Sequence, residues 1–135
     1  MSDSPELVIR RFLTALEAPD EVDEIVSFFA DDGEYLDPIR GVHRGLDAIR
    51  SEFRAQAAMG FANVVATHVK FIVADGGIVM MERCDSWTIG SKSFSMDVLA
   101  AFVLDDDGRI KRWRDSYDTK LITEQVESAG FHVPS

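Results

Sequence analysis

The chain has 135 residues, a length that suits one domain, spanning residues 1–135, with a buried core. Hydrophobic residues make up 46% of the chain and charged residues 28%, which is typical of a soluble globular protein. The formal net charge is −10, which argues against nucleic acid and anionic membranes as partners, because phosphate binding needs a basic patch.

The first half of the chain is predicted to be mostly helical. Pro5 to Leu16 carries apolar residues near helical spacing, and Ser4 is a plausible N-cap. Two further helices are expected at about 21–29, with an acidic first turn, and at Leu46–Met59, ended by Gly60.

The segments between these helices look short and polar. Residues 30–33 are predicted to form a turn, residues 34–37 a short strand stopped by Pro38, and residues 40–45 a loop with two glycines.

From residue 61 the apolar residues alternate as in β-strands. Strands are predicted at 61–73, 78–89, 93–104 and 109–117, followed by a short helix at 119–129. Helices followed by an antiparallel meander indicate the α+β class, with the N-terminal helices packed on one face of a curved sheet. The inner face of such a sheet can form a cone, with a pocket lined by alternate residues of several strands.

The strand at 78–89 places charges among apolar residues. Its alternation puts Met81, Arg83, Asp85 and Trp87 on one side. Buried charges are tolerated only when they are paired, so this side is predicted to meet an ionic partner.

A second pattern of this kind occurs in the last strand. Trp113, Asp115 and Tyr117 share one face of it, and Tyr35 and Asp37 share a face of the short strand at 34–37. We expect all of these faces to meet in one pocket.

Two carboxylates with an arginine between them are suited to acid–base chemistry. Burial and a second carboxylate raise a carboxyl pKa, whereas arginine keeps one carboxylate ionised. One acid and one carboxylate then coexist near pH 7, and their apparent pKa values belong to the pair. Such a pair can serve as general acid and general base.

A purely structural interpretation stands beside this one. Arg83, Asp85 and Asp115 also fit a structural ion pair, and Tyr35 fits a core residue with a bonded hydroxyl. The three histidines have no metal-ligand spacing, and the chain has no phosphate loop or dinucleotide fingerprint. We therefore expect neither a metal nor a cofactor.

The order of elements resembles the cone-shaped fold shared by nuclear transport factor 2, ketosteroid isomerases and polyketide cyclases. The stretches Phe28–Asp32 and Gly45–Arg50 resemble the end of helix 2 and the third helix of those families. Within that group, Glu82-Arg83-Cys84-Asp85 together with Trp113-Arg114-Asp115-Ser116-Tyr117-Asp118 is similar to the limonene-1,2-epoxide hydrolase family.

That resemblance implies a role for each charged residue. Asp115 would be the general base that activates water and Asp85 the general acid that protonates the epoxide oxygen. Arg83 would bridge them, and Tyr35 would hold the water. Asp37 occupies the position of the family's asparagine, so either it carries a proton and imitates an amide or the site does something else.

The predicted lining of the pocket is apolar and indicates a small hydrophobic substrate: Met81, Trp87, Phe94, Met96, Val98 and Tyr117. Two other functions remain open, namely an isomerase or cyclase that moves a proton next to a carbonyl, and a non-catalytic ligand-binding dimer.

We also expect a homodimer formed through the outer face of the sheet, which carries Glu82, Cys84, Ser86, Asp97 and Leu99. The chain shows no secretory signal and no apolar run long enough to span a bilayer, so we expect a cytoplasmic protein. Cys84 is the single cysteine, which rules out an intramolecular disulfide.

Overall fold

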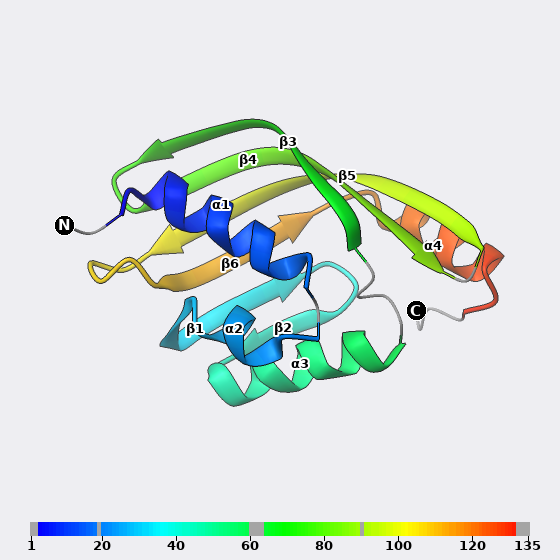
Figure 1. The fold of residues 1–135 in the computed structure, drawn as a ribbon, viewed down its shortest axis with the longest axis horizontal. Coiled ribbons are helices and arrows are strands. Elements are labelled where there is room, and N and C mark those ends of the chain that lie inside the picture. Colours follow the sequence, from blue (N-terminus) through cyan, green and yellow to red (C-terminus); the bar gives the residue numbers. More distant parts are fainter. Residues whose placement is uncertain (1–2, 19, 60–63, 90, 132–135) are drawn as a thin grey trace.

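A computed structural model describes residues 3–18, 20–59, 64–89 and 91–131 (Figure 1). The elements in chain order are α1 (Pro5–Leu16), α2 (Val22–Val26), β1 (Phe29–Asp37), β2 (Gly41–Arg44), α3 (Leu46–Met59), β3 (Val64–Asp75), β4 (Ile78–Ile89), β5 (Lys92–Leu104), β6 (Ile110–Ser116) and α4 (Thr119–Ser128).

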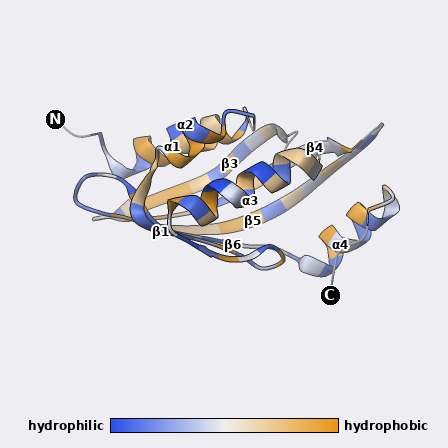
Figure 2. Cartoon of the chain, turned by 90° about the horizontal axis from the view of Figure 1, so that it is seen from below, coloured by the Kyte–Doolittle hydropathy of each residue, from blue (hydrophilic) through white to orange (hydrophobic). Residues whose placement is uncertain are grey.

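The strands form one six-stranded mixed sheet in the order β2-β1-β6-β5-β4-β3. The β1–β6 pair is parallel, and each of the other neighbouring pairs is antiparallel. The sheet is strongly curved, and α1, α2 and α3 cover one of its faces (Figure 2). The predicted α+β architecture, with three N-terminal helices on a curved sheet, is confirmed.

Helix α1 supplies much of the core that lies under this sheet. The Ser4 side chain caps the helix by accepting from the backbone N–H of Leu7, and Pro5 occupies the first turn. On the buried side of α1, Phe12 makes edge-to-face contacts with Phe29 and Trp113. The core therefore joins the first helix directly to β1 and β6.

The predicted helix at about 21–29 is present but shorter, whereas the predicted turn at 30–33 is wrong. Helix α2 ends at Val26, and β1 begins at Phe29 and runs through that stretch with a shift of register against β6. Gly33 allows this close approach, because a Cβ there would lie 3.0 Å from the carbonyl oxygens of Ala30 and Ile110. The Asp-Asp-Gly composition that suggested a turn belongs to an irregular strand.

The predicted loop at 40–45 is also wrong, because residues 41–44 form the edge strand β2. It pairs antiparallel with β1, and His43 lies opposite Tyr35. Gly41 and Gly45 have positive φ angles of 89° and 85°, so the two glycines bracket this strand. The strand is too short for alternation to reveal it.

The later strands agree with their predicted positions apart from their ends. Strand β3 continues to Asp75 and β5 begins at Lys92, whereas β6 ends at Ser116. Gly60, predicted to end α3, and residues 61–63, predicted to begin β3, lie outside the described residues. In the described ranges, each helix is too short or too polar to cross a bilayer.

Candidate active site

The middle of β4 carries the charged residues at the centre of the site. Its residues alternate strictly between buried and less buried positions, and Arg83 and Asp85 belong to the buried set. Arg83 is 3% exposed and Asp85 is 8% exposed. The alternation of the strand therefore turns both charges inward, as predicted.

Arg83 holds two carboxylates at once. Its Nη1 and Nη2 atoms donate to Oδ1 and Oδ2 of Asp115 at 3.0 and 2.7 Å, and its Nε donates to both oxygens of Asp85 at 3.1 and 3.2 Å. Asp115 lies on β6, so the guanidinium reaches over β5, where Ala100 pairs with Asp115.

Asp85 has a second donor on the neighbouring strand. Thr67 of β3 lies directly opposite Asp85, and its hydroxyl donates to Asp85 Oδ1 at 3.1 Å. Asp85 Oδ2 has a single described partner, the Nε of Arg83. The contact from Thr67 was not predicted, since register across two strands is not readable from one strand's alternation.

The two carboxylate oxygens of Asp115 have different numbers of hydrogen-bond donors. Oδ1 accepts from Arg83 Nη1 and, at 2.7 Å, from Trp113 Nε1, whereas Oδ2 has Arg83 Nη2 as its described donor. Burial raises the pKa of Asp115 above its ordinary value, and the Arg83 guanidinium only partly offsets this effect. Oδ2 is therefore the oxygen best placed to take up a proton.

The arginine between the two acids stays charged. Burial acts to lower the pKa of Arg83, but the charges of Asp115 and Asp85 outweigh burial, and the pKa lies above its ordinary value. A buried guanidinium with two carboxylates satisfies the requirement that buried charges be paired.

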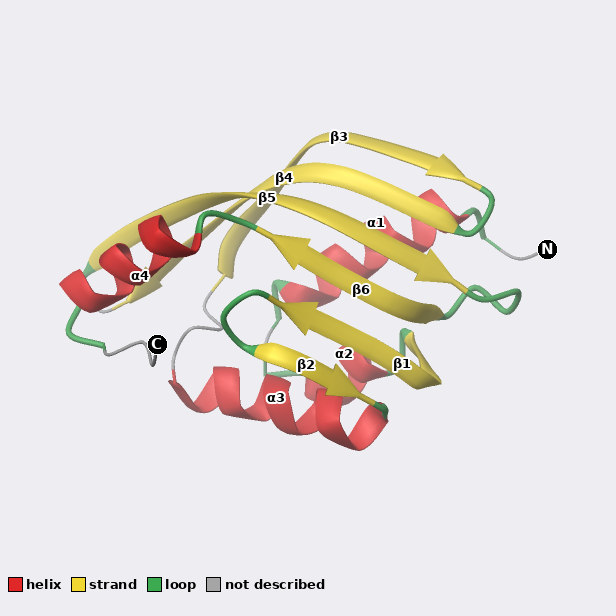
Figure 3. Cartoon of the chain, turned by 180° about the vertical axis from the view of Figure 1, so that it is seen from behind, coloured by secondary structure: helices red, strands yellow, loops and turns green. Residues whose placement is uncertain are grey.

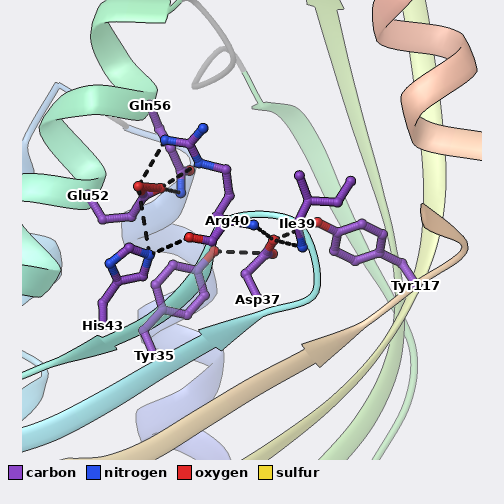
Figure 4. A network of polar contacts seen from close by, with 8 residues as sticks. All are labelled: Tyr35, Asp37, Ile39, Arg40, His43, Glu52, Gln56 and Tyr117. Carbon is purple, nitrogen blue, oxygen red and sulfur yellow. Dashed lines mark hydrogen bonds and ion pairs between the residues drawn. The ribbon is translucent and has the colours of Figure 1, made fainter. Parts of the chain in front are cut away.

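Tyr35 and Asp37 lie at the end of β1, which pairs with β6, the strand that carries Asp115. Figure 4 shows the polar contacts of these two residues. The Tyr35 ring stacks on Trp113 with 4.3 Å between the ring centroids. The Tyr35 hydroxyl lies 3.4 Å from Asp37 Oδ1, and the Tyr117 hydroxyl donates to Asp37 Oδ2 at 2.7 Å. Both predicted β1 residues thus lie beside β6, the strand that carries Asp115, and Tyr117 is a further neighbour.

The turn after β1 is tied to α3 by a buried glutamate that sequence reasoning missed. Glu52 is 6% exposed, and it accepts from Arg40 Nε and Nη2 at 2.8 and 2.9 Å and from Gln56 at 2.8 Å. His43 lies beside the same carboxylate (Figure 4). The sequence did contain a signal for this contact, because Glu52 is a charged residue at an inward position of α3.

The predicted apolar lining divides into two groups. Met81 and Val98 are almost completely buried beside the charged residues. Trp87, Phe94, Met96 and Tyr117 form a second cluster with Ile122 and Val126 of α4, which lies beside the far ends of β4 and β5 (Figure 3). Phe94, Met96 and Tyr117 are half-buried, so part of their surface stays open.

Within residues 3–18, 20–59, 64–89 and 91–131, no three His, Cys, Asp or Glu side chains are placed to hold a metal ion together.

Comparison with known proteins gives the site a family context. A family model described as a SnoaL-like domain matches residues 9–113. The chain is 34% identical over 114 residues to epoxide hydrolase EphG of Mycobacterium tuberculosis, with 82% of this chain and 70% of that protein covered.

Solved structures show the same fold. An LEH-like epoxide hydrolase of M. tuberculosis matches with a TM-score of 0.71 and 25% identity, over 90% of this chain and 88% of that one. A protein of ketosteroid isomerase-like fold from Catenulispora acidiphila, in complex with trimethylamine, matches with a TM-score of 0.76 at 18% identity, over 93% and 94% of the two chains. TerC, co-crystallised with polyporic acid, matches with a TM-score of 0.73 at 20% identity, over 92% and 99%.

Proposed function

The chain belongs to the SnoaL-like family of nuclear transport factor 2-like proteins, and from this premise we propose that it is a cofactor-independent epoxide hydrolase. It would add water to a small hydrophobic epoxide and release a vicinal diol. The observation that carries the proposal is the buried Arg83 that holds Asp85 and Asp115 together. The relatives named as epoxide hydrolases support it.

In the proposed reaction, Asp115 is the general base. Its Oδ2 takes a proton from water while the water oxygen forms a bond to one epoxide carbon. The raised pKa of Asp115, caused by burial, favours proton uptake by this carboxylate. General-base assistance of this kind typically contributes about 10²–10⁴-fold.

Asp85 is the proposed general acid. The two acids share one proton, and in the reacting state Asp85 gives it to the epoxide oxygen as the ring C–O bond breaks, so that no free alkoxide forms. One proton has then left water for Asp115 and one has left Asp85 for the diol. Transfer of the proton from Asp115 back to Asp85 restores the starting state, and Arg83 keeps its charge throughout.

The apolar residues beside the acids support a hydrophobic substrate. Phe94, Met96 and Tyr117 are half-buried and lie on the same face as Asp85, next to Trp87. We propose that this apolar surface receives the hydrocarbon part of the epoxide. Exclusion of bulk water there would strengthen the charged contacts of the acids.

The contacts at Asp37 weigh against the isomerase alternative. An isomerase of this fold needs a hydroxyl or a protonated acid that donates to an enolate oxygen. The Tyr117 hydroxyl donates to Asp37, and Tyr35 faces the same carboxylate. Arg83 faces both acids instead of turning away from them, which favours hydrolysis.

The experiment that tests the function is incubation with a panel of apolar epoxides in ¹⁸O-labelled water. We expect the wild type to form diol with one ¹⁸O atom, and Asp115→Asn to lose at least about 10²-fold in rate. Asp106→Asn, at an exposed turn position, makes the same change of charge and is the matched control. Failure of the wild type to form diol from any epoxide would rule the function out.

We also propose that the protein is a homodimer in solution. Five large apolar side chains on the outer face of β3, β4 and β5 are each more than half exposed: Phe71, Val73, Ile78, Met80 and Leu99. Contiguous apolar patches of this kind mark protein contacts, and a second copy presents a patch of the same character. The cytoplasmic location remains a prediction.

Light scattering after size exclusion tests the dimer. Met80→Glu places a charge in the patch and is expected to give a monomer. Leu121→Glu, at an exposed leucine on α4, is the control and should leave the dimer intact. A wild type that runs as a monomer at concentrations of tens of micromolar contradicts this proposal.

A further inference from the structure

Asp37 is surrounded by hydrogen-bond donors. Its Oδ2 accepts from the backbone N–H groups of Ile39 and Arg40 at 3.0 and 2.8 Å and from the Tyr117 hydroxyl at 2.7 Å (Figure 4). Its Oδ1 lies 3.4 Å from the Tyr35 hydroxyl. Accepting on both oxygens is the behaviour of a carboxylate, so Asp37 does not imitate an amide, which donates from one side.

The turn that supplies the two backbone donors is itself fixed. Arg40 makes a bidentate ion pair with Glu52, which is almost fully buried on α3 and also accepts from Gln56. The orientation of Asp37 is thus built into the packing of the turn against α3. Rotation of its carboxylate would leave two backbone N–H groups without their acceptor.

The two tyrosine hydroxyls that face Asp37 have one hydrogen each. Burial and then the charge of Asp37 raise the pKa of both Tyr35 and Tyr117, so both hydroxyls keep their hydrogens. A hydroxyl whose hydrogen points at a carboxylate presents only lone pairs to its other neighbours. Each hydroxyl then acts as an acceptor toward the rest of the site.

Tyr35 lies beside the proposed base. It pairs with Trp113 across the parallel strands β1 and β6, and the next residues in that register are Leu36 and Arg114. Continuing the register by one residue places Asp37 beside Asp115. The stacked Trp113 ring donates to Asp115 Oδ1, which leaves Oδ2 as the more open oxygen of the base.

We propose, on the basis of the proposed hydrolase function, that Asp37 is a positioning residue that turns the Tyr35 hydroxyl into an acceptor for the reacting water. One hydrogen of this water points at Asp115 Oδ2 and the other at Tyr35 Oη. With both hydrogens engaged, a lone pair of the water oxygen is free to attack the epoxide carbon. An asparagine at position 37 would donate to the Tyr35 hydroxyl, whereas the Asp37 carboxylate accepts from it.

The variant Asp37→Asn tests this polarity directly. Its carbonyl oxygen can keep the contacts to the turn and to Tyr117, while its amide group faces Tyr35 and donates to the hydroxyl. The Tyr35 hydrogen must then turn away from position 37. Neutron diffraction from perdeuterated crystals locates this hydrogen without any need for turnover.

We expect the deuterium on Tyr35 to point at Asp37 in the wild type and away from position 37 in Asp37→Asn. A wild-type deuterium on Tyr35 that points away from Asp37, or a deuterium found on the Asp37 carboxyl group, overturns the proposal. These outcomes do not depend on diol formation, so a failure of the hydrolase function is recognised separately in the ¹⁸O experiment.

A double-mutant cycle supplies the kinetic test. Asp37→Asn is expected to lower kcat on the order of 10-fold, with a smaller change in KM, because the loss of one positioning contact has this size. The same substitution in a Tyr35→Phe background should change kcat less than about 2-fold, since Asp37 acts through the Tyr35 hydroxyl. Equal losses in both backgrounds contradict the proposal.

Discussion

Replacement of Arg83 by methionine, which keeps an unbranched apolar stem and removes the charged guanidinium, is predicted to destabilise the fold strongly. The guanidinium is 3% exposed and makes four N–O contacts with Asp85 and Asp115. Removing one partner of a buried ion pair typically costs about 3–5 kcal/mol, because a buried charge is left uncompensated. For a chain of this length, that cost corresponds to a fall in Tm of roughly 10–18 °C.

The loss caused by Arg83→Met should depend on pH in a stated direction. Burial already raises the pKa of Asp115 in the wild type, and removal of the guanidinium takes away the main effect that opposes this rise. A carboxyl group with a raised folded-state pKa contributes stability below its unfolded pKa and loses that contribution as pH rises through its folded pKa. The variant should therefore recover part of its deficit as pH falls from 7 to 5.

Urea unfolding followed by fluorescence at pH 7 and pH 5 measures both effects. A matched variant, Arg83→Met with Asp85→Asn and Asp115→Asn, removes all three charges and is expected to regain much of the lost free energy of unfolding. A cost below about 1 kcal/mol for Arg83→Met at pH 7, or a deficit that grows as pH falls, would refute the reasoning that a buried charge pair holds this site together.

Three further predictions concern residues around the site. Trp113→Phe keeps an aromatic ring but removes the N–H group that donates to Asp115 and lowers its pKa. The acid limb of the pH profile of kcat/KM should therefore move to higher pH by about one unit, and a limb that does not move contradicts the role of Asp115 as the base. Glu52→Gln weakens the bidentate contact with Arg40 and should lower the free energy of unfolding by about 1–3 kcal/mol in urea titrations, whereas a neutral result means that the turn is held by other contacts. Asp118→Ala removes the N-cap of α4, which accepts from the Leu121 N–H, and should cost about 1 kcal/mol in the same assay, whereas Asp118→Asn should retain most of it.

The inward-facing charges were predictable because their strands are long and regular. Twelve residues of β4 alternate without a bulge against β5, so the parity of Arg83 and Asp85 could be read from the chain. The catalytic roles assigned to these residues come from a resemblance and remain predictions. Long periodic elements constrain side-chain direction well, and this constraint is what placed the two acids on one face.

The parts that were mispredicted or missed depend on contacts between distant residues. Nothing local marks residues 41–44 as a strand, because its stability comes from pairing with β1. The Arg40–Glu52 ion pair joins a turn to a helix, and the contact from Thr67 to Asp85 depends on the register of two strands. Each of these requires knowledge of which elements are neighbours, which periodicity does not supply.

The position of β1 between β2 and β6 has a consequence for how the molecule is made. Asp37 and Tyr117, which meet in the site, are 80 residues apart in the chain. During synthesis, the hairpins of β3, β4 and β5 are available for folding before β6 has left the ribosome, whereas β1 must wait for its parallel neighbour. Non-local pairing of this kind slows folding, so the site around Asp37, Asp85 and Asp115 cannot be completed until β6 has emerged.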